Sequence, residues 1–106
     1  MNYHYTVKFT GVDANIPNKL RRRTHIIRSI LAEGQVELTR HALDELAADG
    51  ATAADAEHVL RAGIVEDAEW ERGEWRYRVH AGDLWLVVAL EAPSVLVVVT
   101  GWRTKR

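Results

Sequence analysis

Three side chains that bind anions or exchange protons stand at alternate positions in one short segment: Arg76, Arg78 and His80. If this segment is a β-strand, the three lie on one face, because successive residues of a strand point to opposite sides. Guanidinium groups in such a row can hold a phosphate and stabilise the charge that builds on it during RNA backbone cleavage. The alternative is a solvated strand face that balances Glu74 and the neighbouring acidic residues.

A second candidate is His41, which occurs in the sequence Thr39-Arg40-His41-Ala42. Thr39 stands where a helix N-cap would, so His41 would lie in the first turn of that helix. There the imidazole could act as a general base on a ribose 2′-hydroxyl, or bind a phosphate beside free backbone N–H groups. The alternative is that Thr39 caps the helix while His41 packs or binds a backbone carbonyl.

Two basic stretches are candidate contacts for an RNA backbone. The C-terminal stretch combines cations with a tryptophan, which suits a single strand, since its backbone binds charge and its bases stack on aromatic rings. It equally suits a frayed terminus. The N-terminal arginine cluster could instead bind an acidic partner protein or solvate a helix. The candidate RNA-binding residues are Arg21, Arg22, Arg28, Thr100, Arg103 and Lys105.

The composition excludes several other kinds of chemistry. The 106 residues contain no cysteine, which excludes disulfides, thiolate metal sites and a thiol nucleophile. The sequence has no glycine-rich phosphate loop, no nucleophile elbow and no His-Glu-x-x-His motif. The five histidines show no metal-ligand spacing. We therefore expect neither a metal nor another cofactor.

The charges are distributed unevenly along the chain. The formal net charge is −1, yet residues 1–32 carry +5 (six Lys or Arg against one Asp) and residues 75–106 carry +3 (five against two). Residues 33–74 carry −9, with twelve acidic residues against three arginines. Because both ends are basic and the middle is acidic, the overall charge does not indicate the kind of partner.

Length and hydropathy predict a single domain over residues 1–106 in the cytoplasm. A chain of this size buries roughly 65% of its unfolded surface, enough for one core. The longest apolar runs, Leu84–Leu90 and Val95–Val99, are too short to cross a bilayer. The N-terminal residues have no signal-peptide core.

Hydrophobic periodicity places the candidate residues on an α+β framework. Residues 1–17 form an N-terminal strand, over 3–10, and a loop. Helical patterns follow over 18–33, 40–48 and 52–62, with 35–38 as a short extended link, and then strand patterns over 64–70, 74–81, 84–91 and 95–103. Short turns between these later strands predict antiparallel neighbours. The last two strands are apolar on both faces, which predicts that helices or a partner subunit cover both.

The order of these motifs resembles the RelE-like superfamily of small bacterial mRNA interferases. It is similar above all to the MqsR-type toxins and to a related uncharacterised family whose helix opens with Ser/Thr-x-His-Ala. The resemblance covers about residues 18–106. It is carried by Thr39-Arg40-His41-Ala42, Trp75-Arg76-Tyr77-Arg78-Val79, Gly82-Asp83-Leu84 and Val97-Val98-Val99-Thr100, followed by a basic tail.

The resemblance implies a helical layer on a curved antiparallel sheet. It implies metal-independent cleavage by the RNA's own 2′-hydroxyl, and inhibition by a cognate antitoxin of a bacterial type II toxin–antitoxin system. The helix-opening motif falls on His41 and the strand arginine on Arg78, with Arg76 beside it. These arginines would hold the scissile phosphate, and His41 or His80 would move protons. The remaining positions, on the terminal strand and tail, are Thr100, Arg103 and Lys105.

One departure favours a different class of protein. Trp85 stands where the MqsR-type toxins have a tyrosine, and an indole does not exchange protons at neutral pH; Tyr77 is the nearby substitute. Together with the acidic middle and the two-sided apolar strands, this supports an alternative hypothesis. The chain would then be a non-catalytic protein-interaction module, as a homodimer.

Overall fold

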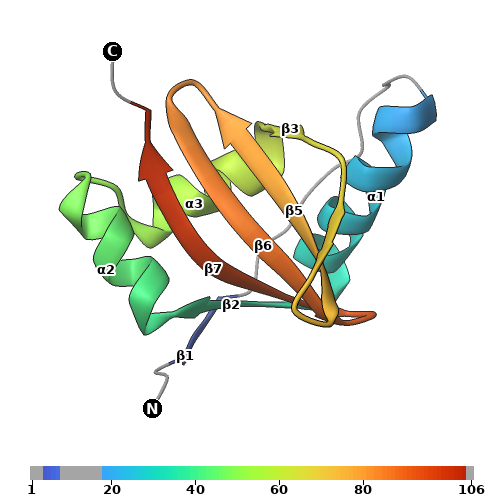
Figure 1. The fold of residues 1–106 in the computed structure, drawn as a ribbon, viewed down its shortest axis with the longest axis horizontal. Helices are drawn as coiled ribbons and strands as arrows, with labels where there is room; N and C mark the ends of the chain where they lie inside the picture. The colour runs from blue at the N-terminus through green and yellow to red at the C-terminus, as the bar shows by residue number, and fades with distance from the viewer. Residues whose placement is uncertain (1–3, 8–17, 105–106) are drawn as a thin grey trace.

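The computed structural model describes residues 4–7 and 18–104, with side chains from residue 22 onward. The predicted loop before residue 18 and the end of the basic tail lie outside the described residues. Three helices pack on one β-sheet, which confirms the α+β class (Figure 1). The elements are β1 (His4–Val7), α1 (Asn18–Glu33), β2 (Gln35–Thr39), α2 (Arg40–Ala48), α3 (Ala53–Ala62), β3 (Ile64–Val65), β4 (Glu69–Glu71), β5 (Glu74–Ala81), β6 (Leu84–Ala92) and β7 (Val95–Arg103).

The sheet is mixed, which corrects the prediction of an antiparallel sheet. Its strand order is β1-β2-β7-β6-β5-β3, and β4 also pairs with β5. β2 runs parallel to β7, whereas the other described pairs are antiparallel. β2 is the segment predicted as a link, and it joins the sheet because Val36 and Leu38 are buried beside β7. The long chain between β2 and β7 provides the crossover that a parallel pair requires.

The N-cap predicted at Thr39 is confirmed, and α3 begins with a capping box at Thr52. The Thr39 hydroxyl accepts a hydrogen bond from the Ala42 backbone N–H at 3.0 Å and caps α2. At α3, the Thr52 hydroxyl accepts from the Asp55 backbone N–H, and the Asp55 carboxylate accepts from the Thr52 backbone N–H. The hydrogen bonds from Thr52 hold the pKa of Asp55 below its ordinary value of 3.8. These two caps set where each short helix leaves the sheet.

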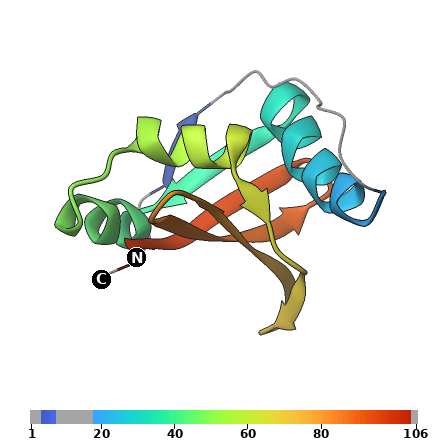
Figure 2. The same cartoon turned by 90° about the horizontal axis from the view of Figure 1, so that it is seen from above.

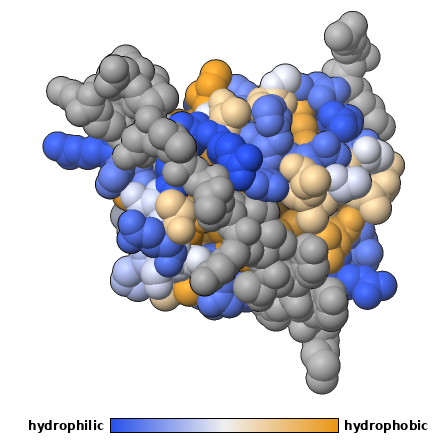
Figure 3. All heavy atoms as spheres, turned by 180° about the vertical axis from the view of Figure 1, so that it is seen from behind, coloured by the Kyte–Doolittle hydropathy of each residue, from blue (hydrophilic) through white to orange (hydrophobic). Residues whose placement is uncertain are grey.

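The described helices contribute to one core on one face of the sheet. Figure 2 shows α1 and α3 on the same side of the strands. Seen from behind, the coloured surface is largely hydrophilic with scattered apolar residues, as expected for the outer sides of helices (Figure 3). The buried residues of this core include Ile27 and Leu31 of α1, Leu46 of α2, Val59 and Leu60 of α3, and Tyr77, Val79, Leu86, Val88, Leu96 and Val98 of the strands. No described helix is long and apolar enough to span a membrane.

The opposite side of β5, β6 and β7, which we call the open sheet face, has no described helix over it (Figure 2). Of the two predicted covers for this face, helices or a partner subunit, the described helices do not supply one, and a partner subunit stays a prediction. Cross-strand register places three rows of side chains on this face: His80, Trp85 and Trp102; Arg78, Val87 and Thr100; Arg76, Ala89 and Val97. Ala89 and Val97 on this face are buried although they lie outside the main core.

Candidate active site on the open sheet face

The alternation of β5 places three of the four predicted catalytic residues together. Tyr77 and Val79 are buried in the core, so Arg76, Arg78 and His80 lie on the open sheet face. Thr100 of β7 occupies the same cross-strand row as Arg78, with Val87 between them. The predicted placement of Arg76, Arg78 and His80 on one strand face is thus confirmed.

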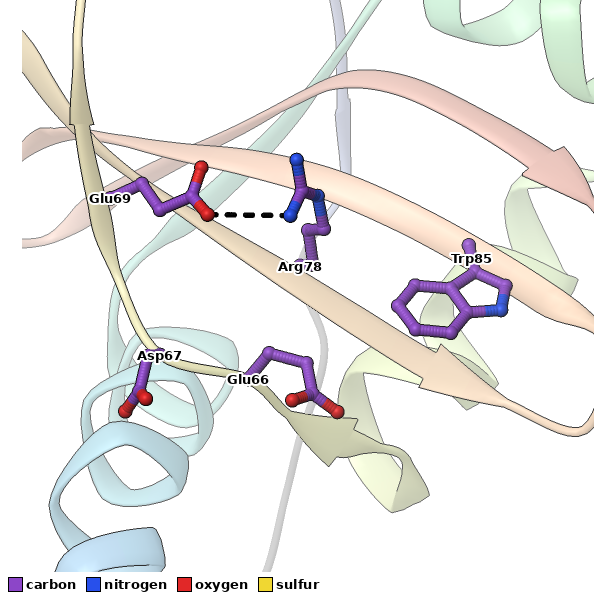
Figure 4. A pocket seen from close by; sticks show the side chains of 5 residues that line it. All are labelled: Glu66, Asp67, Glu69, Arg78 and Trp85. Atoms are coloured by element: carbon purple, nitrogen blue, oxygen red, sulfur yellow. Dashed lines mark hydrogen bonds and ion pairs between the residues drawn. The ribbon is translucent and has the colours of Figure 1, made fainter.

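A pocket of about 280 Å³ opens beside Arg78 (Figure 4). It is lined by Glu66 and Asp67 from the β3–β4 link, Glu69 of β4, Arg78 of β5 and Trp85 of β6. Glu69 reaches across to Arg78, whose Nη1 lies 3.3 Å from the carboxylate. Asp67 pairs instead with Arg23 of α1. The pocket therefore combines one guanidinium, an indole and three carboxylates.

His80 is held in one orientation at the edge of this pocket. Its Nε2 lies 2.7 Å from Oε2 of Glu66. Its ring stacks on Trp85, with centroids 4.0 Å apart and planes 15° apart. The side chain keeps 19% exposure. A carboxylate that orients an imidazole is a recurring arrangement for proton transfer, because it fixes the tautomer and stabilises the imidazolium that forms.

The two arginines differ in availability. Arg76 is 20% exposed and contacts two carboxylates, Glu74 at 3.0 Å and Glu71 at 3.8 Å. Arg78 is 53% exposed, and its one ion-pair partner among the described residues is Glu69, itself exposed. An exposed ion pair contributes only about 0–1 kcal/mol, so a phosphate can replace Glu69 at Arg78. Arg76 is held as part of the β4–β5 hairpin.

The structure does not bring His41 to these residues. α2 packs beside β7 and β2, and β6 separates β7 from β5. Thr39 and Ala42 of the helix-opening motif have structural roles, since Thr39 caps α2 and Ala42 is fully buried. His41 is exposed, and its side chain makes no hydrogen bond or ion pair with the other described residues.

Several of the predicted RNA-binding residues do not lie on the open sheet face. Arg28 is only 7% exposed and donates to the backbone carbonyls of Leu60 and Gly63 at 3.4 and 3.1 Å. It satisfies the C-terminal end of α3 and is not available to RNA, which corrects that prediction. Arg22 is exposed on α1, on the helical side. The side chains of Arg21 and Lys105 lie outside the described residues.

Arg103 is also engaged within the fold. Its backbone N–H and Nε donate to the Asp49 carboxylate and carbonyl at 2.8 and 3.0 Å, and its Nη1 to Asp83 at 2.8 Å. These bonds tie the end of β7 to the end of α2 and to the β5–β6 turn. A phosphate contact at Arg103 would have to displace them.

Sequence reasoning missed Glu66 as the partner of His80, and the reason is a shift in register. The β4–β5 pairing matches Glu69 with Arg76, and continuing it would place Asp67 opposite Arg78. β3 pairs with β5 one residue out of that register, matching Val65 with Val79. This irregularity is of the kind that bulges produce. Glu66 therefore lies opposite Arg78, as its hydrogen bond to the Arg78 carbonyl confirms.

Within the described residues, no three His, Asp or Glu side chains are arranged to hold a metal ion. Comparisons with models of protein families, with curated proteins and with solved structures found no match. The RelE-like resemblance thus stays a prediction from the order of motifs.

Proposed function

We propose that the open sheet face is the active surface of a metal-independent endoribonuclease of the mRNA interferase type. The observation that carries this proposal is that His80, held by Glu66 and stacked on Trp85, lies beside the pocket and two residues from the exposed Arg78 on the same strand face. This set provides a proton acceptor, a phosphate-binding group and an aromatic surface. These groups can accept the 2′-hydroxyl proton, stabilise the charge on the phosphoryl group and stack on a base.

In the proposed reaction His80 accepts the proton of the ribose 2′-hydroxyl. The 2′-oxygen then forms a bond to the adjacent phosphorus, and the bond from phosphorus to the 5′-oxygen breaks. Arg78 takes the place of a solvent cation at the phosphoryl oxygens, where negative charge builds in the transition state. Water donates a proton to the leaving 5′-oxygen through the open side of the pocket. The products are a 2′,3′-cyclic phosphate and a 5′-hydroxyl.

Substitution of the two central residues tests this proposal. His80→Gln should lower the rate of RNA cleavage about 100-fold or more, because it removes the proton acceptor. Arg78→Gln should lower the rate by a similar factor, because it removes the charge that stabilises the transition state. The matched controls are His58→Gln and Arg61→Gln, both exposed on α3, which should keep wild-type rates. Cleavage is measured in the presence of a chelator, with the product ends identified.

His41→Gln separates the present proposal from the prediction made from the sequence. It should leave the rate within about twofold of wild type, because α2 lies two strands away from β5. A wild-type protein that cleaves no RNA and does not arrest growth on expression contradicts the nuclease proposal. The cytoplasmic location and the cognate antitoxin belong to the same proposal.

A second function is favoured by the charges on the face. Arg76 and Arg78 both pair with carboxylates. The pocket is lined by three acidic residues and one arginine, and this negative charge repels the phosphates of RNA. The chain would then be a non-catalytic protein-interaction module. Absence of cleavage, harmless expression and a stable dimer in sedimentation would together support that function over the nuclease.

A further inference from the structure

A second hollow lies at the opposite end of β5, between the β4–β5 and β6–β7 turns. It measures about 490 Å³. We call it the indole site, and its principal lining residues are Trp70, Glu74, Trp75, Leu90, Glu91 and Pro93. Trp75 lies on the same side of β5 as Tyr77, whereas Arg78 is on the other side. The indole site is thus separate from the proposed active site.

The two tryptophans of this site are exposed to an unusual degree. Trp70 is 62% exposed and Trp75 is 46% exposed, and together with Ile64 they are the exposed large apolar side chains of the described chain. Neither is needed to fill the core, which contains no tryptophan. Clustered exposed apolar surface of this kind marks binding sites in soluble domains.

The geometry of the pair and the charge around it indicate the ligand. The two indoles are opposite each other across β4 and β5, with centroids 5.2 Å apart and planes at 74°. The face of an aromatic ring attracts cations through its quadrupole, most strongly for tryptophan. The lining adds the carboxylates of Glu74 and Glu91 and no cationic side chain. Glu74 pairs with Arg76, whereas no ion pair of Glu91 is found among the described residues.

We propose that the indole site binds an arginine or lysine side chain presented by a basic segment of a partner protein. The tryptophan faces attract the cation, and Glu91 and Glu74 supply complementary charge. The same carboxylates repel RNA, so the site does not extend the proposed RNA surface. The proposal is independent of whether the open sheet face cleaves RNA.

The test uses the four indole N–H signals in a nitrogen–proton correlation spectrum of the intact chain, assigned with single Trp→Phe variants. The probe is the peptide acetyl-Gly-Arg-Gly-Arg-Gly-amide. Its control is the same peptide with citrulline in place of arginine, which keeps the shape and removes the charge. The arginine peptide should shift the Trp70 and Trp75 signals and leave those of Trp85 and Trp102 in place.

Two variants and one matched control sharpen the assignment. Trp75→Leu should lower the affinity for the arginine peptide about fivefold or more, and Glu91→Gln should lower it about threefold. Trp102→Leu, which removes an indole from the open sheet face, should leave the affinity unchanged. The dispersion of the remaining amide signals shows that each variant is folded.

Four results would overturn the proposal. The citrulline peptide could bind equally well, which would mean an apolar ligand. The Trp85 and Trp102 signals could shift instead, which would place the cation in the acidic pocket beside Arg78. Shifts of Trp70 and Trp75 on raising the protein concentration alone would indicate a second copy of the chain. Absence of any shift at millimolar peptide would exclude a cation site.

Discussion

At Arg78 an internal carboxylate and the proposed substrate compete for one guanidinium. Glu69 holds the Arg78 Nη1 at 3.3 Å, yet both side chains are more than half exposed. Solvent screens such a pair, so its contribution is small. A phosphate that binds two guanidinium nitrogens at once has an advantage over one carboxylate oxygen. In the proposed nuclease, Glu69 would therefore lower the affinity of the open sheet face for RNA without blocking it.

Removing this competitor should strengthen RNA binding. Glu69→Gln is expected to raise the affinity for a non-cleavable 2′-deoxy oligonucleotide about two- to fivefold, equivalent to about 0.5–1 kcal/mol. The affinity is measured by fluorescence anisotropy at low salt. Glu45→Gln, an exposed position on α2, makes the same change in net charge and is the control. An equal gain in both variants would mean that only the overall charge matters and that Arg78 is not the ligand.

At the scale of elements, the site depends on how closely α3 approaches β5. Gly63 ends α3, and its backbone N–H donates to the Val59 carbonyl at 2.8 Å. A Cβ added at Gly63 would lie 2.5 Å from that carbonyl and 2.6 Å from the His80 carbonyl. Only glycine lets the chain pass from α3 into β3 at this spacing. This passage carries Glu66 to its position opposite Arg78.

Gly63→Ala should therefore disturb both the fold and the site. The clash involves two backbone atoms, so the expected loss in the free energy of unfolding is about 1–3 kcal/mol, measured by urea denaturation. Gly73→Ala provides the comparison, because Gly73 has a φ of +81° but open space around it. It should cost less, about 1 kcal/mol, from backbone strain alone. A Gly63→Ala variant as stable as wild type would contradict the close approach of α3 and β5.

Over the whole molecule, arginines of the two basic segments pair with carboxylates of the acidic middle. Arg23 of α1 contacts Asp67, Arg76 of β5 contacts Glu71, and Arg78 of β5 contacts Glu69. The acidic middle of the chain is thus partly neutralised by the basic segments around it. The uneven charge of the sequence reflects internal pairing as well as any partner.

The stability of the protein at alkaline pH tests whether Tyr77 is buried in the core. Burial raises the pKa of Tyr77 above its ordinary value of 10.0, and the charge of Arg23 lowers it in part. The unfolded chain therefore releases this proton first, so stability should fall as the pH rises above 10. Tyr77→Phe keeps the aromatic ring and removes the hydroxyl that titrates. Its free energy of unfolding, measured by urea denaturation, should fall less than that of the wild type between pH 9 and about pH 11. Parallel curves for both proteins would mean that Tyr77 is not buried.

The sequence by itself determined the helices, their caps and the face of β5 that carries the arginines. These follow from local rules: the spacing of apolar residues, the hydroxyl of Thr39 or Thr52 at a helix start, and the alternation of a strand. It predicted Arg76, Arg78 and His80 on one side because that placement needs no knowledge of any other element.

Only the tertiary structure decided which side chains contact Arg76, Arg78 and His80. The parallel pairing of β2 with β7 and the one-residue shift between β3 and β4 depend on contacts between distant segments. They determine that Glu66 accompanies His80, that His41 stands apart and that Arg28 is used inside the fold. Register is set by the packing of whole faces against each other, and a one-dimensional pattern does not contain that information.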